Sequence, residues 1–334
     1  MLDNPHYLRD RSNMLADPFS DILKLTNAEA VVTGGFTAGG SWAIDFPGRD
    51  KVKFFAVLKG HCWILLDGEP GWIRFGTGDI GLLAVNRTFV IASEPGLAPI
   101  DAMTLFSGPP NNYAVLGDGE DFEHIGGHVL LDPVRGKLVA DVLPPWIHIR
   151  ADAPQAAVLR WILDRLVAER KAGLPGTSFA SAQLTQLLFV EILRAHLATA
   201  ELLPAGWLRA LADARIAPAL RLMHGDPARA WHLDELAVAC AMSRTSFAQH
   251  FKTAAGVPAL TYLIQWRMRL AERALREETV LVARLAHRLG YTSESAFSNA
   301  FRRVTGMSPN ACRRAARRGS GKGDPAIGDA AGAQ

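Results

Sequence analysis

Cysteine is scarce in this chain of 334 residues, and long apolar runs are missing. Cys62, Cys240 and Cys312 are too few and too far apart for a disulfide framework or a zinc site. No run approaches the roughly 20 apolar residues that a transmembrane helix needs. The first residues lack the basic-then-apolar pattern of a signal peptide, so we expect a cytoplasmic protein.

The length and composition predict a folded chain of more than one domain. Hydrophobic residues make up 49% of the sequence, which is enough to form proper cores and is not typical of a disordered chain. A chain of 334 residues is too long for one typical core. We therefore expect two or three domains.

The charged residues are distributed unevenly. Residues 1–206 contain 17 Lys and Arg against 23 Asp and Glu, whereas residues 207–318 contain 18 against 8. An acidic N-terminal part followed by a basic C-terminal part is expected when only one domain of a protein binds a polyanion. A solvated basic surface without such a partner is the alternative that charge alone leaves open.

The spacing of apolar residues divides the chain into four parts. Residues 1–150 contain short strand-like runs between turns, which predict an antiparallel, cupin-like barrel or a sandwich. Residues 151–206 contain two runs of helical period, at about 155–172 and 178–199, which we expect to pair two chains. Residues 207–318 are expected to be all helix, and the small polar tail, 319–334, to be disordered. The predicted fold class is multidomain, β then α.

Two stretches of the basic region repeat each other. The anchors of the first are Leu236, Ala237, Phe247, Phe251 and Gly256, and those of the second are Leu285, Ala286, Phe297, Phe301 and Gly306. Each copy has a short helix, a turn, a serine placed to cap a second helix, two buried phenylalanines and a final glycine. These features predict two helix-turn-helix motifs, at 233–256 and 282–306.

The segment between the two copies also has helical period, beginning near Pro258. About 18 helical residues form a rod of roughly 27 Å, close to the roughly 34 Å between successive major-groove faces of a duplex. One chain is therefore expected to bind two adjacent grooves. An all-helical protein-interaction domain with coincidental repeats is the alternative.

The repeated region resembles the AraC/XylS family of bacterial transcription regulators. The matching residues are Leu236-Ala237, Met242-Ser243, Phe247, Phe251, Gly256-Val257-Pro258, Trp266-Arg267, Leu270-Ala271, Leu285-Ala286, Leu289-Gly290-Tyr291, Ser295-Ala296-Phe297, Phe301-Arg302-Arg303 and Gly306-Met307-Ser308-Pro309. The resemblance implies two helix-turn-helix subdomains joined by a rigid helix on consecutive major grooves. It also implies a sequence-specific DNA-binding regulator that is not an enzyme.

The same resemblance assigns roles to individual residues. The residues expected to read bases are Thr245, Ser246, Ala248 and Gln249 in the first copy and Glu294, Ser295, Ser298 and Asn299 in the second. Those expected to contact phosphate are Ser243, Arg244, Lys252, Arg302 and Arg303. Small and amide side chains suit base edges, and flanking cations suit phosphates.

The front of the chain resembles the cupin-type sensor domain of one branch of that family, at residues 57–63, 78–83 and 143–148. Phe55 and Phe89 stand where relatives commonly have histidine, whereas metal-dependent cupins need a cluster of histidines and a carboxylate. We therefore expect neither a metal nor another cofactor, and interpret His61 as a surface or turn residue. His124 and His128 are a conceivable metal pair, but the two glycines between them indicate a strand or turn.

Aromatic residues are numerous in this front region. Phe55, Trp63, Trp72 and Phe89 are the candidates for an apolar effector pocket in the barrel mouth, and the alternative is that the rings fill the core. Residues 76–81 fit the dinucleotide fingerprint letter by letter. They lie between strand-like runs and do not open a helix, so we interpret them as a turn.

Two other functions fit part of the sequence. The first is a cupin oxygenase or isomerase, which would need a metal cluster and would leave the basic repeat without a role. The second is a scaffold, in which the C-terminal third would bind another protein and not DNA. The expected partners are operator DNA, a small-molecule effector, a second copy of the chain and, for an activator, RNA polymerase. The effector, the operator sequence and the direction of regulation are not encoded in any recognisable motif.

Overall fold

The computed structural model describes residues 17–48, 51–84, 87–106, 113–131, 136, 143–199 and 203–320. The chain divides into two compact units, one from Ile22 to Pro204 and the other from Ala205 onward together with the residues up to Asp21. The boundary falls within helix α1 (Pro18–Leu25). The described helices include none that is long and apolar enough to cross a membrane. The last described helix ends at Ser320, so residues 319–320, predicted as part of a disordered tail, are helical. The rest of the predicted tail, 321–334, lies outside the described residues.

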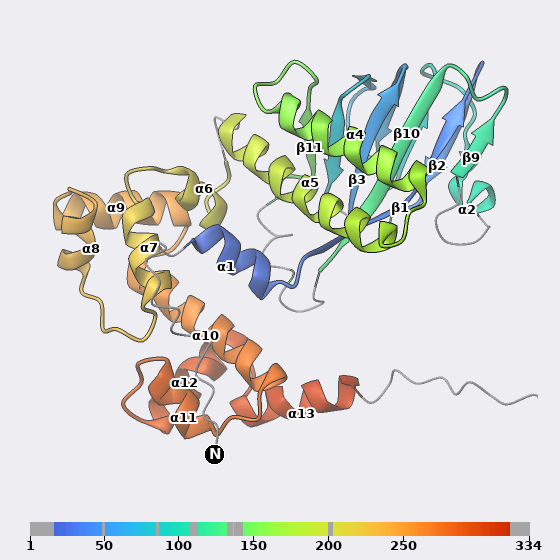
Figure 1. The fold of residues 1–334 in the computed structure, drawn as a ribbon. Coiled ribbons are helices and arrows are strands. Elements are labelled where there is room, and N and C mark those ends of the chain that lie inside the picture. Colours follow the sequence, from blue (N-terminus) through green and yellow to red (C-terminus); the bar gives the residue numbers. More distant parts are fainter. Residues whose placement is uncertain are drawn as a thin grey trace, which may run out of the picture. The chain divides into compact units, whose positions relative to one another are not determined.

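The unit from Ile22 to Pro204 is built on two β-sheets (Figure 1). Their strands are β1 (Glu29–Ala38), β2 (Ala43–Phe46), β3 (Val52–Lys59), β4 (His61–Leu66), β5 (Ile73–Gly76), β6 (Ile80–Leu83), β7 (Phe89–Ala92), β8 (Ile100–Asp101), β9 (Tyr113–Leu116), β10 (Phe122–Leu130) and β11 (Trp146–Ile149). One sheet has the order β11-β6-β3-β10-β1-β9 and the other β5-β4-β7-β2-β8. The predicted β-rich first part is confirmed.

The structure corrects the prediction of an antiparallel barrel in two respects. Strand β9 pairs with β1 in parallel, and β8 pairs with β2 in parallel. The described strands also form two separate sheets and not a closed ring, and the chain passes from one sheet to the other several times, for example between β3 and β4. Parallel partners are joined by long connections, so the turn signals that mark hairpins in a sequence could not reveal them.

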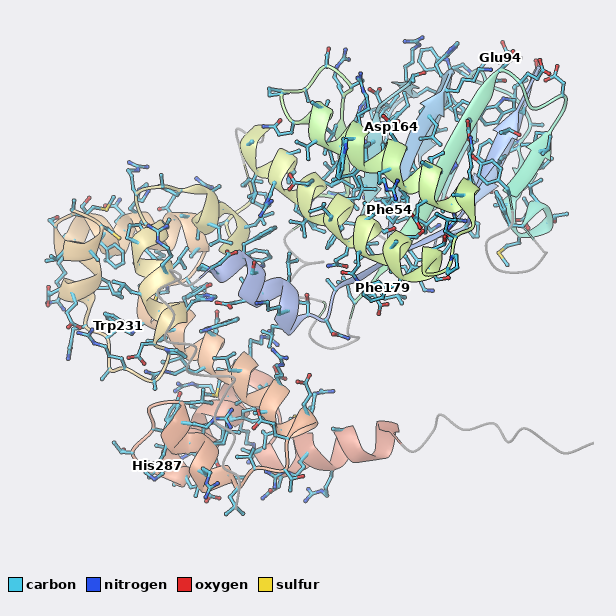
Figure 2. The ribbon with its side chains drawn as sticks, viewed as in Figure 1. Phe54, Glu94, Asp164, Phe179, Trp231 and His287 are labelled. Atoms are coloured by element: carbon cyan, nitrogen blue, oxygen red, sulfur yellow. The ribbon has the colours of Figure 1, made fainter. Side chains whose placement is uncertain are left out.

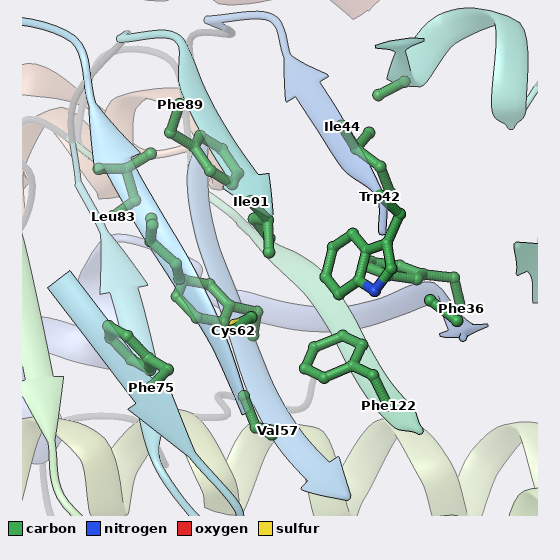
Figure 3. Close-up of a cluster of buried hydrophobic side chains, with 14 of the residues drawn as sticks. Phe36, Trp42, Ile44, Val57, Cys62, Phe75, Leu83, Phe89, Ile91 and Phe122 are labelled. Atoms are coloured by element: carbon green, nitrogen blue, oxygen red, sulfur yellow. The ribbon is translucent and has the colours of Figure 1, made fainter. Parts of the chain in front are cut away.

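One apolar core lies between the two sheets (Figure 3). Phe36, Phe55 and Phe122 reach it from the first sheet, and Phe75 and Phe89 from the second. Burial alternates along β4, where Cys62, Ile64 and Leu66 point inward, as expected for a strand with one face on a core.

Two helices cover the outer face of the six-stranded sheet, α4 (Ala156–Ala172) and α5 (Thr177–Thr199) (Figure 1). They pack on each other, and α5 also contacts β1 and β11. The Ala30 amide of β1 donates a hydrogen bond to Gln186 Oε1 of α5 at 3.0 Å. The helices predicted near 155–172 and 178–199 are therefore present. A short helix, α2 (Ala102–Leu105), follows β8.

In the described part of the unit from Ala205 onward, residues 205–320, every regular element is a helix, as predicted. Its helices are α6 (Trp207–Ala212), α7 (Ala217–Gly225), α8 (Leu233–Ala239), α9 (Arg244–Ala255), α10 (Ala259–Glu277), α11 (Val282–Arg288), α12 (Glu294–Thr305) and α13 (Pro309–Ser320). Helix α10 contacts α9 on one side and α12 and α13 on the other. It has 19 residues, which is about 28 Å at 1.5 Å per residue, so the rod expected between the two repeats is confirmed.

Candidate nucleic-acid interface

Helices α9 and α12 begin and end in the same way. The hydroxyl oxygens of Ser243 and Ser293 each accept a hydrogen bond from a backbone amide three residues further on, at 3.2 and 3.1 Å. Gly256 and Gly306 follow the last helical residues in the left-handed conformation, with φ of 76° and 78°. This conformation satisfies the final carbonyls and favours glycine. The caps predicted for both copies are confirmed.

The inward faces of α9 and α12 are also equivalent. Phe247 and Phe251 of α9 are fully buried with ring centroids 5.6 Å apart, and Phe297 and Phe301 of α12 are fully buried 5.8 Å apart. Phenylalanines four residues apart lie one above the other on a helix. Each helix is thereby fixed with its opposite face toward solvent.

The residues expected to read bases lie on these outward faces. Six of the eight are exposed, and only Ala248 and Ser298 are half-buried. These two are 50 positions apart and occupy the same place in α9 and α12. Gln249 and Asn299, the next residues, are exposed amides at equivalent places. The two helices therefore present matching polar faces.

The cations expected to contact phosphate are also on the surface. Lys252, Arg302 and Arg303 are exposed. Arg244 pairs with Asp234 at 3.5 Å, with side chains 66% and 64% exposed. An ion pair in water is worth little, so Arg244 can exchange the carboxylate for a phosphate at small cost. Ser243 is exposed but its oxygen already caps α9, so toward a phosphate it can act as a donor through its hydroxyl proton.

Arg267 of α10 ties the two halves of this unit together. Its guanidinium donates from Nε to the Pro227 carbonyl at 2.5 Å and from the second terminal nitrogen to the Arg229 carbonyl at 2.8 Å. The cation also lies 5.7 Å from the centre of the Tyr291 ring, which precedes α12. Arg267 matches the family motif, but the sequence did not reveal its role. The available signal was an arginine directly after Trp266, on the apolar face of a helix whose other charges lie further along.

A buried histidine supports the start of α10 in the same unit. The His224 side chain is fully buried between Asp21, whose Oδ2 lies 3.2 Å from Nδ1, and the Tyr262 hydroxyl, 2.8 Å from Nε2. Its ring stacks on Trp266 at 4.0 Å. Burial lowers the pKa of His224, although Asp21 acts in the opposite direction. Its contacts with Tyr262 and Trp266 pack α7 against α10.

The four residues expected to line an effector pocket in the first unit are not brought together. Phe55 and Phe89 lie in the core, where their rings stack at 6.4 Å, and the ring of Phe75 lies 5.2 Å from that of Phe55. Figure 3 shows Phe75 and Phe89 in this core. Trp63 and Trp72 are half-buried and lie outside this cluster. The packing of Phe55 and Phe89 corresponds to the filled core that the sequence left as the alternative.

The histidines of the first unit lie in separate environments. His61 is exposed, and His124 is buried against Phe36, with ring centroids 4.9 Å apart. Burial lowers the pKa of His124 to about 3. His128 is half-buried on the same strand, four residues further on. Among the residues that the structure describes, no three His, Cys, Asp or Glu side chains are grouped so that they could hold a metal ion.

The segment 76–81 connects strand β5 to strand β6 and opens no helix, which confirms the interpretation as a turn. Asp79 holds this turn in place. Its carboxylate accepts hydrogen bonds from the amides of Gly76 at 3.0 Å and Ala151 at 2.7 Å, and its Oδ2 lies 3.1 Å from His148 Nε2. Asp79 therefore anchors the start of the segment that leads to α4.

Comparison with known proteins identifies relatives of both units. A cupin family model matches residues 17–198, and a helix-turn-helix domain model matches residues 236–315. A putative AraC-like transcription regulator of Streptomyces lividans is 38% identical over 298 residues, covering 89% of this chain and 98% of that protein. Another, of Streptomyces antibioticus, is 37% identical over the same shares. The solved DNA-binding domain of AdpA, in complex with a target DNA, is 30% identical with a TM-score of 0.31, covering 33% of this chain and 98% of that one.

Proposed function

Because the chain belongs to the AraC-like transcription regulators, we propose that it binds operator DNA through two helix-turn-helix motifs, with α9 and α12 in adjacent major grooves. The observation that supports this proposal is the equivalence of the two helices. Both have a serine cap, two buried phenylalanines and a polar outer face with an exposed amide at the same place. A helix of this kind fits the major groove with its N-terminal residues against base edges.

The exposed amide side chains are the residues that we propose determine which bases are recognised. Both Gln249 and Asn299 are exposed. On this proposal they form paired hydrogen bonds with adenine, and Glu294 accepts a hydrogen bond from cytosine. Thr245, Ser246, Ala248, Ser295 and Ser298 complete the two base-reading faces. Ser243, Arg244, Lys252, Arg302 and Arg303 contact the phosphates that flank these bases.

The N-terminal unit is proposed to pair two chains and to bind a small-molecule effector. Helices α4 and α5 expose several large apolar side chains, among them Trp161, which is 60% exposed, and Phe179, which is 74% exposed. Phe179 is labelled in Figure 2. Exposed apolar side chains in such numbers mark an interaction surface. Two chains would bring four helix-turn-helix motifs to one operator. We propose that this occurs in the cytoplasm and that, if the protein is an activator, it also contacts RNA polymerase.

Competition gel-shift experiments test the DNA-binding proposal. The full-length protein is mixed with labelled DNA from upstream of its own gene and with increasing amounts of unrelated competitor duplex. A shifted band that survives a large excess of competitor is expected. Complete loss of the band at equal amounts of competitor would contradict sequence-specific binding and would favour a protein-interaction domain.

A further inference from the structure

A cavity of about 560 Å³ lies outside the apolar core, between the six-stranded sheet and the helices α4 and α5. All of its lining residues belong to the unit from Ile22 to Pro204. Its size falls within the range of roughly 300–1,000 Å³ typical of small-molecule sites. It is separate from the core cluster that contains Phe55 and Phe89.

The two walls of the cavity differ in chemistry. The sheet contributes an apolar wall, chiefly Val32, Leu58 and Ile125. Helix α5 contributes a row of hydroxyl groups at helical spacing, from Thr177, Ser178, Ser181 and Thr185. An apolar surface that faces a few convergent polar groups is the usual construction of a ligand site.

One of these hydroxyl groups lacks a partner. Ser181 is only 8% exposed, and its Oγ makes no hydrogen bond with any described residue. Its neighbours are satisfied, because Thr185 donates to the Ser181 carbonyl at 2.6 Å and Thr177 donates to the Glu169 carbonyl at 3.4 Å. A buried hydroxyl without a partner has lost its hydrogen bonds to water and gained none in return. A rotation of the Ser181 side chain about χ1 would turn its hydroxyl toward the cavity, where a polar atom of a bound molecule could supply the missing partner.

The charges at the cavity leave one cation in excess. Lys171 lies 3.9 Å from Glu123, whose Oε1 also accepts a hydrogen bond from the Tyr113 hydroxyl at 2.9 Å. The half-buried Arg170 forms no ion pair with a described residue. It lies close enough to Tyr113 to act electrostatically on that hydroxyl. The lining therefore carries two positive charges and one negative charge.

We propose that this cavity binds a small monoanion with an apolar body, such as an aromatic or aliphatic acid. The anionic group lies beside Arg170, the apolar body covers the sheet wall, and a polar atom meets Ser181. That the bound acid is the effector of a regulator rests on the proposed function. A ligand in this cavity contacts both the sheet and the helices α4 and α5. Its binding is therefore coupled to the position of these helices on the sheet, and so to the surface that exposes Trp161 and Phe179.

Two fluorescent probes that differ by one charge test the proposal on the full-length protein. 8-Anilinonaphthalene-1-sulfonate is a monoanion with an aromatic body, and N-phenyl-1-naphthylamine is the same body without the sulfonate. The wild type is expected to bind the sulfonate saturably. Arg170→Gln is expected to weaken that binding about tenfold, as for a lost charge-assisted hydrogen bond, and to leave the neutral probe unaffected.

Two further variants complete the test. Ala182→Met fills the cavity from α5 and is expected to abolish binding of both probes, whereas Arg194→Gln, an exposed arginine of α5 outside the cavity, is expected to change neither. Melting curves of each variant verify that it is folded. The absence of sulfonate binding by the wild type, or binding that survives both Arg170→Gln and Ala182→Met, would overturn the proposal.

The same samples separate this inference from the proposed function. Operator binding is measured by gel shift without any probe. A protein that binds DNA but fails the probe test loses only the cavity proposal. A protein that passes the probe test without binding DNA keeps the cavity as a site for acids but loses its regulatory role.

Discussion

Ala241 and Gly290 occupy equivalent places 49 positions apart, one in the turn before α9 and the other in the turn before α12, and both are left-handed, with φ of 52° and 78°. Their surroundings differ. A Cβ atom on Gly290 would lie 1.9 Å from the Ala228 carbonyl oxygen, which also accepts a hydrogen bond from Arg267. A left-handed φ favours glycine in both turns, but only the second turn also lacks room for a Cβ atom.

The unfolding free energies of two variants should reflect this difference. Gly290→Ala is expected to destabilise the protein by well over the roughly 1–2 kcal/mol that a left-handed alanine costs, because the backbone must also move away from Ala228. Ala241→Gly should range from neutral to stabilising by about 1 kcal/mol, since relief of strain offsets the greater freedom of the unfolded chain. Urea unfolding measures both. Equal effects of the two substitutions would contradict the interpretation.

The stability of the first unit should depend on the protonation of His124. Burial lowers its pKa to about 3, so the folded protein keeps it neutral while the unfolded chain takes up a proton below its ordinary value of 6.5. This contribution is complete above pH 6.5 and is lost as the pH falls from 6.5 toward 3, by up to about 1.4 kcal/mol per pH unit. His124→Leu should flatten the pH dependence of the unfolding free energy, and exposed His61→Leu should not. The same pH slope for His124→Leu and the wild type would refute the assignment.

Phe89 provides a test of whether the space between the sheets is filled. Its ring stacks on Phe46 at 5.0 Å, and the ammonium of Lys53 lies 4.9 Å from its centre. Phe89→Ala should cost about 3–5 kcal/mol of stability, as for a large side chain removed from a packed core. Thermal unfolding of the wild type and of Phe89→Ala, with and without a library of apolar ligands, measures both the loss of stability and any ligand binding. A small loss of stability, together with a ligand that binds the wild type but not the variant, would instead indicate a pocket in the barrel mouth.

Pairing of two chains is expected to depend on the apolar surface of α4 and α5. Trp161→Glu combined with Phe179→Glu places two charges on that surface and should convert a dimer to a monomer. Asp164→Ala, on the same helix α4, serves as a control. Sedimentation at micromolar concentration gives the mass of each. A wild type that is monomeric both with and without DNA would exclude this role for the helices.

The sequence predicted the second unit in more detail than the first for a physical reason. The signals of α9 and α12 are local: a cap such as Ser243, a buried pair such as Phe247 and Phe251, and a final glycine lie within fourteen residues of each other. The parallel pairing of β9 with β1 joins segments more than seventy residues apart, and no local pattern encodes it. The bonds of Arg267 to the loop at 227–229, and the site around Ser181, likewise depend on tertiary contacts that residue spacing does not reveal.

The base preference of Gln249→Ala tests the central claim most directly. The affinity of the wild type and the variant is measured on an operator and on each of its single-base substitutions, with Arg302→Ala as the phosphate control. Gln249→Ala should lose about 1–3 kcal/mol of discrimination at one operator position, whereas Arg302→Ala should weaken all duplexes alike and reduce the slope of log affinity against log salt by about 0.9. A uniform loss of affinity for Gln249→Ala, with every base preference intact, would contradict the assignment of α9 as a base-reading helix.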